Sequence, residues 1–278
     1  MGVLFGLAAA FCWGVSDFVV TRVARSLGVV QAFFYVQLCG IVLTSALLLY
    51  QPGAPAPTPT AWLRALVISI FNLAGTLLLY RSFAIGTLAL VSPIASGFAV
   101  VSALLALLAG ERPALLALVG AVLLIGGVMV VSRGHGSGGT VTLAGVPEAL
   151  GVALCFGIAF WAIDYVTPAL GLLWPVLVIR LVEFVSAIGL LAYRNTRPAT
   201  LDTTGWVLVF AAALLDTLAF VAFNLGVSTA YTTIVTALAA LFSAVTVVLA
   251  WVLLRERLAL AQWVGVAVIL CGVLLVSL

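Results

Sequence analysis

Polar side chains recur at four-residue steps inside two strongly apolar parts of the chain. A step of four keeps side chains near one face of a helix, so each set would form a stripe along one helix. Amide, hydroxyl and carboxyl groups in such a stripe could bind a small polar solute, while aromatic rings among them could cover its apolar part. The first stripe consists of Asn72, Thr76 and Tyr80, and the second consists of Asp216, Phe220 and Asn224.

Four other apolar segments hold residues of the same kinds. Polar groups in hydrocarbon are costly and usually face the interior of a helix bundle or a wet cavity, so we predict that they line the same site. Ser, Thr and Asn also hold helices together without any ligand, and this structural alternative stays open for each single Ser or Thr. The additional predicted substrate-binding residues are Trp13, Ser16, Ser92, Ser96, Phe156, Phe160, Thr232 and Thr236.

The charged residues inside apolar segments are few enough to consider individually. We predict Asp17, Asp164 and Asp216 as candidates for proton coupling, because ionisable groups at such positions commonly belong to proton relays. Arg180 and Glu183 stand three residues apart, which places them on one helix face, and we interpret them as a structural ion pair. No spacing of His, Cys, Asp and Glu indicates a catalytic set, a metal site or a cofactor, so the sequence does not predict an enzyme.

Composition identifies the surroundings in which these residues must work. Of the 278 residues, 65% are hydrophobic and only 7% are charged, and the mean hydropathy is +1.38. A membrane-spanning helix needs about 20 mostly apolar residues. The chain therefore predicts an all-α integral membrane protein in a lipid bilayer. Its ten predicted transmembrane helices lie near 2–21, 30–50, 61–84, 87–110, 114–132, 143–166, 172–193, 204–227, 231–254 and 259–278.

The two halves of the chain resemble each other. A shift of 145 residues places Glu111 on Glu256 and Gly120 on Gly265, and a shift of 143 places Trp13 on another aromatic residue. We predict a first five-helix repeat over 1–133, a linker over 134–142 and a second five-helix repeat over 143–278. Because five is odd, the second repeat would enter the membrane from the opposite side. Such inverted repeats are common in secondary transporters, whose substrate site lies between the halves.

The end of each half also resembles a known family. The stretches "LLAGERPALLALVGAVLLIGGVMVVS" and "WVLLRERLALAQWVGVAVILCGVLLVS", together with "FCWGVSDFVVTR" near the start, are similar to drug/metabolite transporters of the EamA type. The resemblance implies ten helices and a central cavity lined by the first, third, fourth, sixth, eighth and ninth of them. Within that family, the chain most resembles amino-acid exporters of the YddG type. It thus implies alternating-access export of aromatic or other neutral amino acids across the cell (inner) membrane.

Other functions and the orientation stay open at this point. Sugars, nucleotide-sugars or drugs could use the same fold, and a membrane enzyme or structural subunit is a third class. The net charge of +3 comes from scattered Arg residues, which does not indicate nucleic-acid binding, and we expect a monomer. More Arg residues follow odd-numbered than even-numbered segments, which would place the termini outside the cytoplasm. The family resemblance implies termini inside, and we adopt that orientation.

Overall fold

The computed structural model describes residues 2–50, 58–109, scattered positions between 115 and 130, 143–163, 165–229, 232–256 and 258–276. Within these ranges the regular structure is helical, and they contain no strand. Several positions singled out in the sequence lie outside the described residues. These are Glu111, the linker 134–142 and Asp164.

Six helices in the described part of the chain are long and apolar enough to cross a membrane. Their outward-facing side chains are apolar, as at Leu4, Phe11 and Val185, which are each 60% exposed or more. A surface of this kind suits hydrocarbon rather than water. The six helices are α1 (Gly2–Leu27), α2 (Val29–Leu48), α3 (Pro59–Ile85), α7 (Val146–Ile163), α9 (Trp174–Tyr193) and α10 (Thr203–Thr229).

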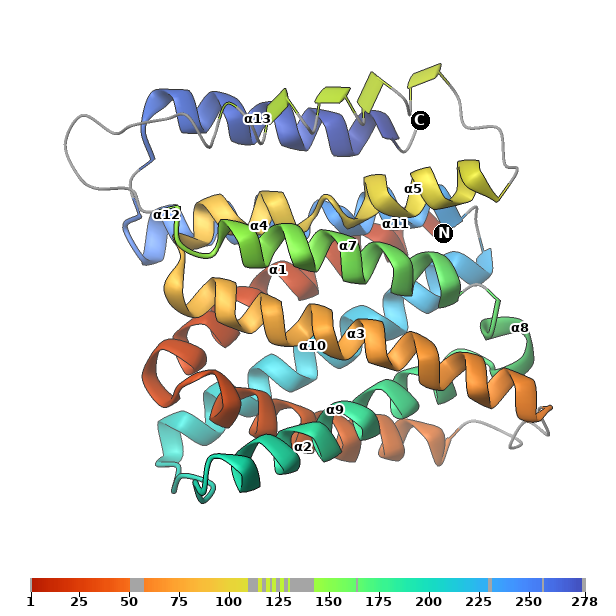
Figure 1. Ribbon diagram of the computed structural model, residues 1–278, viewed down its shortest axis with the longest axis vertical. Coiled ribbons are helices and arrows are strands. Elements are labelled where there is room, and N and C mark those ends of the chain that lie inside the picture. The colour runs from red at the N-terminus through yellow and green to blue at the C-terminus, as the bar shows by residue number, and fades with distance from the viewer. Residues whose placement is uncertain are drawn as a thin grey trace.

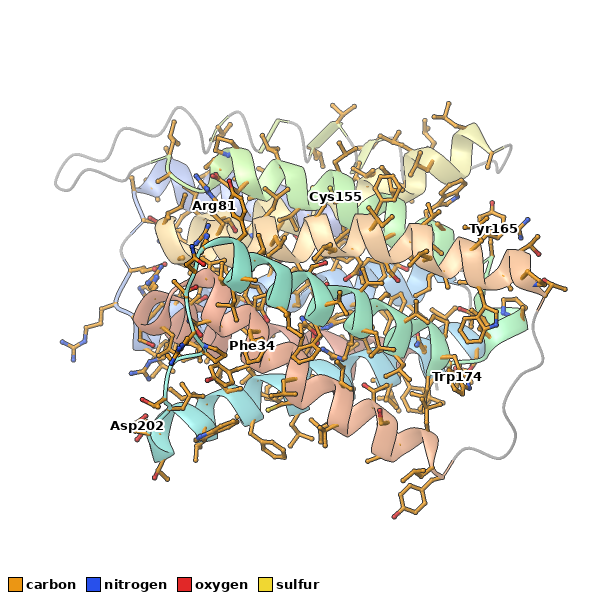
Figure 2. The ribbon with its side chains drawn as sticks, turned by 60° about the horizontal axis from the view of Figure 1, so that its bottom comes forward. Phe34, Arg81, Cys155, Tyr165, Trp174 and Asp202 are labelled. Carbon is orange, nitrogen blue, oxygen red and sulfur yellow. The ribbon has the colours of Figure 1, made fainter. Side chains whose placement is uncertain are left out.

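Aromatic residues are exposed near both ends of these helices, as at Tyr165, before α9, and at Tyr193, where α9 ends. Tyr165 and Trp174 lie at one end of the molecule, opposite the end that carries Arg81 and Asp202 (Figure 2). Tyr and Trp are enriched where a membrane meets water, because their rings are apolar and their tips are polar. The start of α1 and the end of α13 (Leu260–Val276) lie on the same side of the molecule (Figure 1). This placement agrees with an even number of membrane crossings.

The predicted fourth and ninth helices are each interrupted, which corrects the expectation of continuous spans over 87–110 and 231–254. The fourth consists of α4 (Leu88–Ala95) and α5 (Phe98–Leu108), and the ninth of α11 (Thr232–Ala240) and α12 (Phe242–Leu253). Pro93 lies inside α4 and has no backbone N–H, which weakens the helix there. The predicted sixth helix, 143–166, corresponds to α7, which ends at Ile163, and the short α8 (Thr167–Leu170) follows it.

Helices of one half pack mainly against helices of the other half. The most extensive contact joins α1 to α10, and the next joins α3 to α7, followed by α2 with α9. Figure 1 shows α2 and α9 together at one edge of the molecule, with α13 at the opposite edge. The main hydrophobic cluster contains residues from both halves, so the two predicted repeats share one core.

Two glycines allow close approach of helices at equivalent places in the two halves. A Cβ added at Gly14 of α1 would lie 2.6 Å from a backbone oxygen of α12, and one added at Gly157 of α7 would lie 3.1 Å from a backbone oxygen of α5. The carbonyl of Gly14 accepts a hydrogen bond from Thr246 Oγ1 at 3.2 Å. The carbonyl of Gly157 accepts one from Ser102 Oγ at 2.8 Å. A shift of 143 or 144 residues therefore carries one helix crossing onto the other.

Glu256 lies in the turn between α12 and α13 and connects four helix ends. Glu256 Oε1 accepts a hydrogen bond from Arg25 Nη2 at 3.1 Å, and Glu256 Oε2 accepts one from the Ala89 N–H at 2.9 Å. Arg25 also donates to the carbonyl oxygens of Phe83 and Gly86. These bonds attach the α12–α13 corner to the ends of α1, α3 and α4 in the first half. They close one end of the helix bundle.

Candidate functional site

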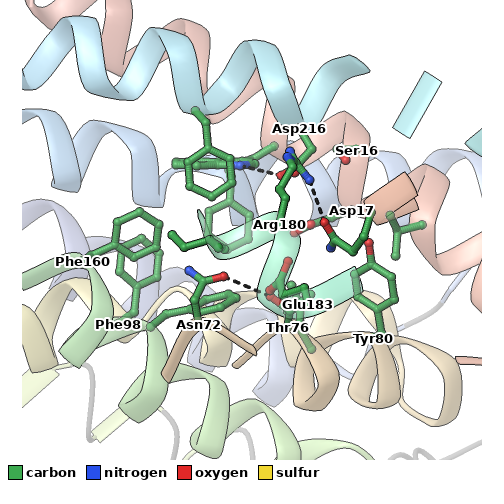
Figure 3. Close-up of a pocket in the computed structure, with 18 residues that line it drawn as sticks. Ser16, Asp17, Asn72, Thr76, Tyr80, Phe98, Phe160, Arg180, Glu183 and Asp216 are labelled. Atoms are coloured by element: carbon green, nitrogen blue, oxygen red, sulfur yellow. Dashed lines mark hydrogen bonds and ion pairs between the residues drawn. The ribbon is translucent and has the colours of Figure 1, made fainter. Parts of the chain in front are cut away.

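A cavity lies between the two halves, and Figure 3 shows the side chains around it. Its volume is about 70 Å³, measured as the space open to the centre of a water-sized sphere, which is room for several water molecules. The lining comes from α1, α2, α3, α5, α7, α9, α10 and α12. The lining residues are Trp13, Ser16, Asp17, Val20, Gln37, Asn72, Thr76, Leu79, Tyr80, Phe98, Phe156, Phe160, Ile179, Arg180, Glu183, Asp216, Phe220 and Phe242.

Aromatic rings form one wall of the cavity. The Trp13 ring meets Phe220 edge-on with centroids 5.3 Å apart and meets Phe160 at 5.8 Å. Phe98 stacks on Phe160 at 5.0 Å and on Phe242 at 6.2 Å. Contacts of this geometry are favourable beyond the area that they bury. The rings therefore hold one another in place and present an apolar surface to the cavity.

A buried guanidinium organises the opposite, polar wall. Arg180 of α9 is 1% exposed, and its Nη2 forms an ion pair with Asp216 Oδ2 of α10 at 2.5 Å. Arg180 Nη1 donates to Gln37 Oε1 of α2 at 2.9 Å, and Nη2 also lies 3.3 Å from Thr217 Oγ1. Asp216 Oδ1 accepts a hydrogen bond from Trp13 Nε1 at 3.0 Å. The network thus connects three helices to the aromatic wall.

Glu183 and Asp17 add two further carboxyl groups to the polar wall. Glu183 is 2% exposed and Asp17 is 8% exposed. Among the ion pairs of the described residues, none supplies a cation to either carboxyl. Glu183 Oε1 is buried and has no hydrogen-bond partner. Thr76 and Asn72, which are joined by a hydrogen bond of 3.3 Å, lie beside Glu183 in Figure 3.

Most of the residues predicted to bind or couple substrate line this cavity. The stripe of α3 lies in the lining in full, whereas the stripe of α10 contributes its first two members only. The predicted residues found in the lining are Trp13, Ser16, Asp17, Asn72, Thr76, Tyr80, Phe156, Phe160, Asp216 and Phe220. Their contribution to transport stays a prediction.

Four other predicted site residues lie outside the lining. Asn224 donates through Nδ2 to the Leu172 carbonyl at 2.5 Å, so it closes a turn before α9 instead of facing the cavity. Ser96 Oγ donates to the Pro93 carbonyl at 2.7 Å. Ser92 is buried, with no partner for its hydroxyl, and Thr236 is buried but does not line the cavity. The Thr232 side chain and Asp164 lie outside the described residues.

Arg180 was expected to pair with Glu183, but in the structure its ion-pair partner is Asp216. Arg180 pairs with Asp216 across helices, because the guanidinium reaches α10 while Glu183, one turn along α9, faces the stripe of α3 (Figure 3). Sequence spacing identifies partners on one helix only. Gln37 is also a lining residue that the sequence reasoning missed. A lone amide within the apolar run "FFYVQLCG" is the signal that could have found it.

Two contacts in the lining join equivalent positions of the two halves. Gln37 and Arg180 are 143 residues apart and share a hydrogen bond. Phe98 and Phe242 are 144 residues apart and stack with an interplanar angle of 13°. Residues related by a two-fold axis can touch each other only near that axis. Both contacts therefore agree with an axis that passes through the cavity.

The described side chains offer no metal site, since no group of three or more His, Cys, Asp and Glu residues among them could hold an ion. The arrangement can instead enclose a small solute that has an apolar body and a charged or polar end. The aromatic wall would cover the body, and the carboxyl, amide and hydroxyl groups would meet the polar end.

Comparison with known proteins agrees with the geometry. A crystal structure described as "Crystal structure of protein" superposes with a TM-score of 0.62 over 100% of this chain and 98% of that one, at 19% identity. At that identity the likeness shows the fold alone. A search of curated proteins finds no match. The model of the EamA-like transporter family matches residues 1–133 and 143–278, and the chain therefore belongs to the EamA-like transporter family.

Proposed function

We propose that this protein is a secondary transporter that exports small metabolites, with neutral and aromatic amino acids as its substrate class. Its family consists of membrane transporters, and the observation that carries the proposal is the cavity between the halves. That cavity has an aromatic wall and a charged wall within a bundle whose outer surface suits lipid. A binding site at mid-membrane, formed where two repeats meet, is the arrangement by which secondary transporters alternate access.

The repeat supplies the mechanism of this proposal. The main helix contacts come in equivalent pairs, since α1 with α10 corresponds to α3 with α7. The Gly14 and Gly157 crossings correspond in the same way. We infer ten transmembrane helices in two inverted five-helix repeats. If each half can adopt the conformation of the other, the cavity opens to one side of the membrane and then to the other. The corner around Glu256 and Arg25 would have to separate in one of these states.

The electrostatics of the lining favour an amino acid over the alternative substrates. A nucleotide-sugar carries phosphate groups, which need unpaired Arg or Lys side chains. The one guanidinium in the described lining is already paired with Asp216, and two further carboxyl groups share the lining with this pair. A drug or a sugar fits the cavity less specifically. Sugars would use the hydroxyl and amide groups of the lining but would bring no large apolar group to pack against the aromatic wall.

Transport in proteoliposomes tests the proposal. The protein would be reconstituted in vesicles loaded with a radiolabelled amino acid such as phenylalanine, and efflux would be measured with and without unlabelled amino acid outside. Exchange between labelled and unlabelled substrate is expected, because a single alternating site returns with substrate bound. Empty vesicles and vesicles with a nucleotide-sugar load serve as controls. If neither phenylalanine nor any other amino acid, sugar or drug in a panel exchanges, the protein is not a transporter of this kind.

A further inference from the structure

We propose that Glu183 forms a subsite for the ammonium group of the substrate, so that the cavity takes small organic amines with an apolar body, whether or not they carry a carboxylate. This inference rests on the proposed transport function and names the chemistry by which that site selects its substrate. It assigns to Glu183 a binding contribution that differs from the intrahelical ion pair expected from its spacing.

The first observation is the state of the Glu183 carboxyl. The residue lines the cavity, is 2% exposed, and has one carboxyl oxygen that is buried without a hydrogen-bond partner. Buried polar atoms are almost always partnered, and leaving one unpartnered is costly. A group that enters the cavity with N–H donors would satisfy this oxygen. An ammonium group supplies three donors together with the opposite charge.

The second observation is the balance of charge around the cavity. Asp17, Glu183 and Asp216 face a single guanidinium among the described lining residues. Arg180 is held by Asp216 at 2.5 Å and by Gln37 at 2.9 Å, so it is committed to that wall. The described lining therefore holds three acidic groups and one basic group. A cationic ligand corrects this imbalance, whereas an anionic ligand increases it.

The third observation concerns the equivalent position in the other half of the chain. Glu183 of α9 corresponds to Gly40 of α2 at the same shift of 143 residues that relates Arg180 to Gln37. A Cβ added at Gly40 would lie 2.5 Å from Arg180 Nη1, so Gly40 provides space for the guanidinium. The packing of α2 against α9 thus needs a small residue at position 40. It does not need a carboxyl group at position 183. Glu183 is an addition that helix packing does not explain.

The aromatic wall completes the subsite. The Trp13 ring contacts the rings of Phe160 and Phe220, and all three rings line the same cavity as Glu183. An apolar body would pack on these rings while the ammonium group faces the carboxyl. Arg180 Nε has no hydrogen-bond partner, but Asp216 already balances the guanidinium charge, so removing a substrate carboxylate should cost little affinity.

A ligand series that differs in one group at a time tests the inference on the wild-type protein in lipid nanodiscs. The probes are 2-phenylethylamine, phenylalanine, 2-phenylethanol and 3-phenylpropionate, with binding followed by calorimetry. We expect 2-phenylethylamine to bind at least as tightly as phenylalanine. The alcohol and the acid should bind roughly 10- to 150-fold more weakly, the range for one lost hydrogen bond to a charged group. Equal binding of amine and alcohol, or tighter binding of the acid, would overturn the ammonium subsite.

A pair of matched variants assigns the effect to Glu183. Glu183→Gln keeps the shape and removes the charge, and it should weaken 2-phenylethylamine about 10-fold or more while leaving 2-phenylethanol unchanged. Glu148→Gln makes the same chemical change in an ion pair with Arg81 outside the cavity and should alter neither affinity. Unchanged amine affinity in Glu183→Gln contradicts the proposal. If Glu183→Gln does not fold, the ligand series on wild type decides alone.

The outcomes separate this inference from the proposed function. Exchange of phenylalanine in vesicles with no preference for amines over alcohols leaves the transporter standing and removes the ammonium subsite. The absence of exchange for every solute in the panel removes the transporter and, with it, the subsite.

Discussion

Arg180→Met should lower the free energy of unfolding by about 3 kcal/mol, at the lower end of the range for breaking a buried ion pair from one side. The guanidinium is almost completely buried, whereas the Asp216 side chain is 23% exposed. Removing Arg180 therefore leaves a carboxyl that has some access to water or to a proton. This access is why the expected loss stays near the lower end.

The magnitude distinguishes an ion pair from ordinary helix contacts. Hydrogen bonds between membrane helices contribute about 0.6 kcal/mol on average. The bonds of Arg180 to Gln37 and Thr217 have a charged donor and should contribute more than that average. The difference between Arg180→Met and a variant that also lacks the Asp216 carboxyl therefore measures what the unpaired charge of Asp216 costs.

A double substitution tests the same reasoning from the other direction. Arg180→Met combined with Asp216→Leu removes both charges, and replacing a buried pair by apolar groups is often close to neutral. Trp13 Nε1 loses its acceptor in this variant, which should leave a deficit of about 1 kcal/mol. Reversible unfolding in mixed detergent–lipid micelles measures the two single variants, Arg180→Met and Asp216→Leu, and the double variant. Losses that simply add would refute the argument, because side chains in direct contact should couple.

Three further predictions concern substitutions at Gly40, Arg25 and Phe160. Gly40→Ala should lower the free energy of unfolding by about 1–3 kcal/mol, since the new Cβ would lie 2.5 Å from Arg180 Nη1, which a hydrogen bond holds in place. The matched control is Gly189→Ala, whose Cβ would meet nothing within 4 Å. Thermal unfolding should show no loss of stability in this control. Arg25→Gln should destabilise more than Arg81→Gln in the same assay, because Arg25 also bonds two backbone carbonyls, whereas the Arg81 side chain is 65% exposed and such pairs contribute about 0–1 kcal/mol; equal losses would contradict this. Phe160→Ala should weaken phenylalanine binding per folded molecule, since its ring stacks in the aromatic wall, and unchanged affinity by calorimetry would count against that wall.

Spacing along single helices predicted a large part of the candidate site. Asn72, Thr76 and Tyr80 share one helix face because four residues make slightly more than one turn, and all three line the cavity. Asn224 fails the same reasoning although its spacing from Asp216 is identical. Eight residues extend about 12 Å along a helix, and on α10 this distance reaches the Leu172 carbonyl beyond the cavity. Periodicity gives the face of a helix but not how far the cavity extends along it.

Side-chain contacts between different helices could not be predicted from the sequence. Arg180 and Asp216 are 36 residues apart on different helices, and nothing in their spacing indicates a contact, whereas Glu183 stands at a distance that suggests one. The interruption near Pro93 could have been expected from its missing backbone N–H. The corresponding interruption at Leu241 could not be predicted in this way, because no proline lies in α12 after it. It becomes predictable only when the repeat is used to transfer the first interruption to the second half.

The repeat also separates residues that build the bundle from residues that choose the substrate. Contacts such as Thr246 with Gly14 and Ser102 with Gly157 occur in both halves, as expected of groups that hold equivalent helix crossings together. The charged groups of the cavity do not recur: Arg180 corresponds to Gln37, and Glu183 corresponds to Gly40. A site built only from repeated residues would be nearly symmetric and could not distinguish the two ends of a solute. The unequal positions give the cavity one acidic wall, so substitutions there should change which solute binds, while substitutions at the repeated crossings should change whether the protein folds.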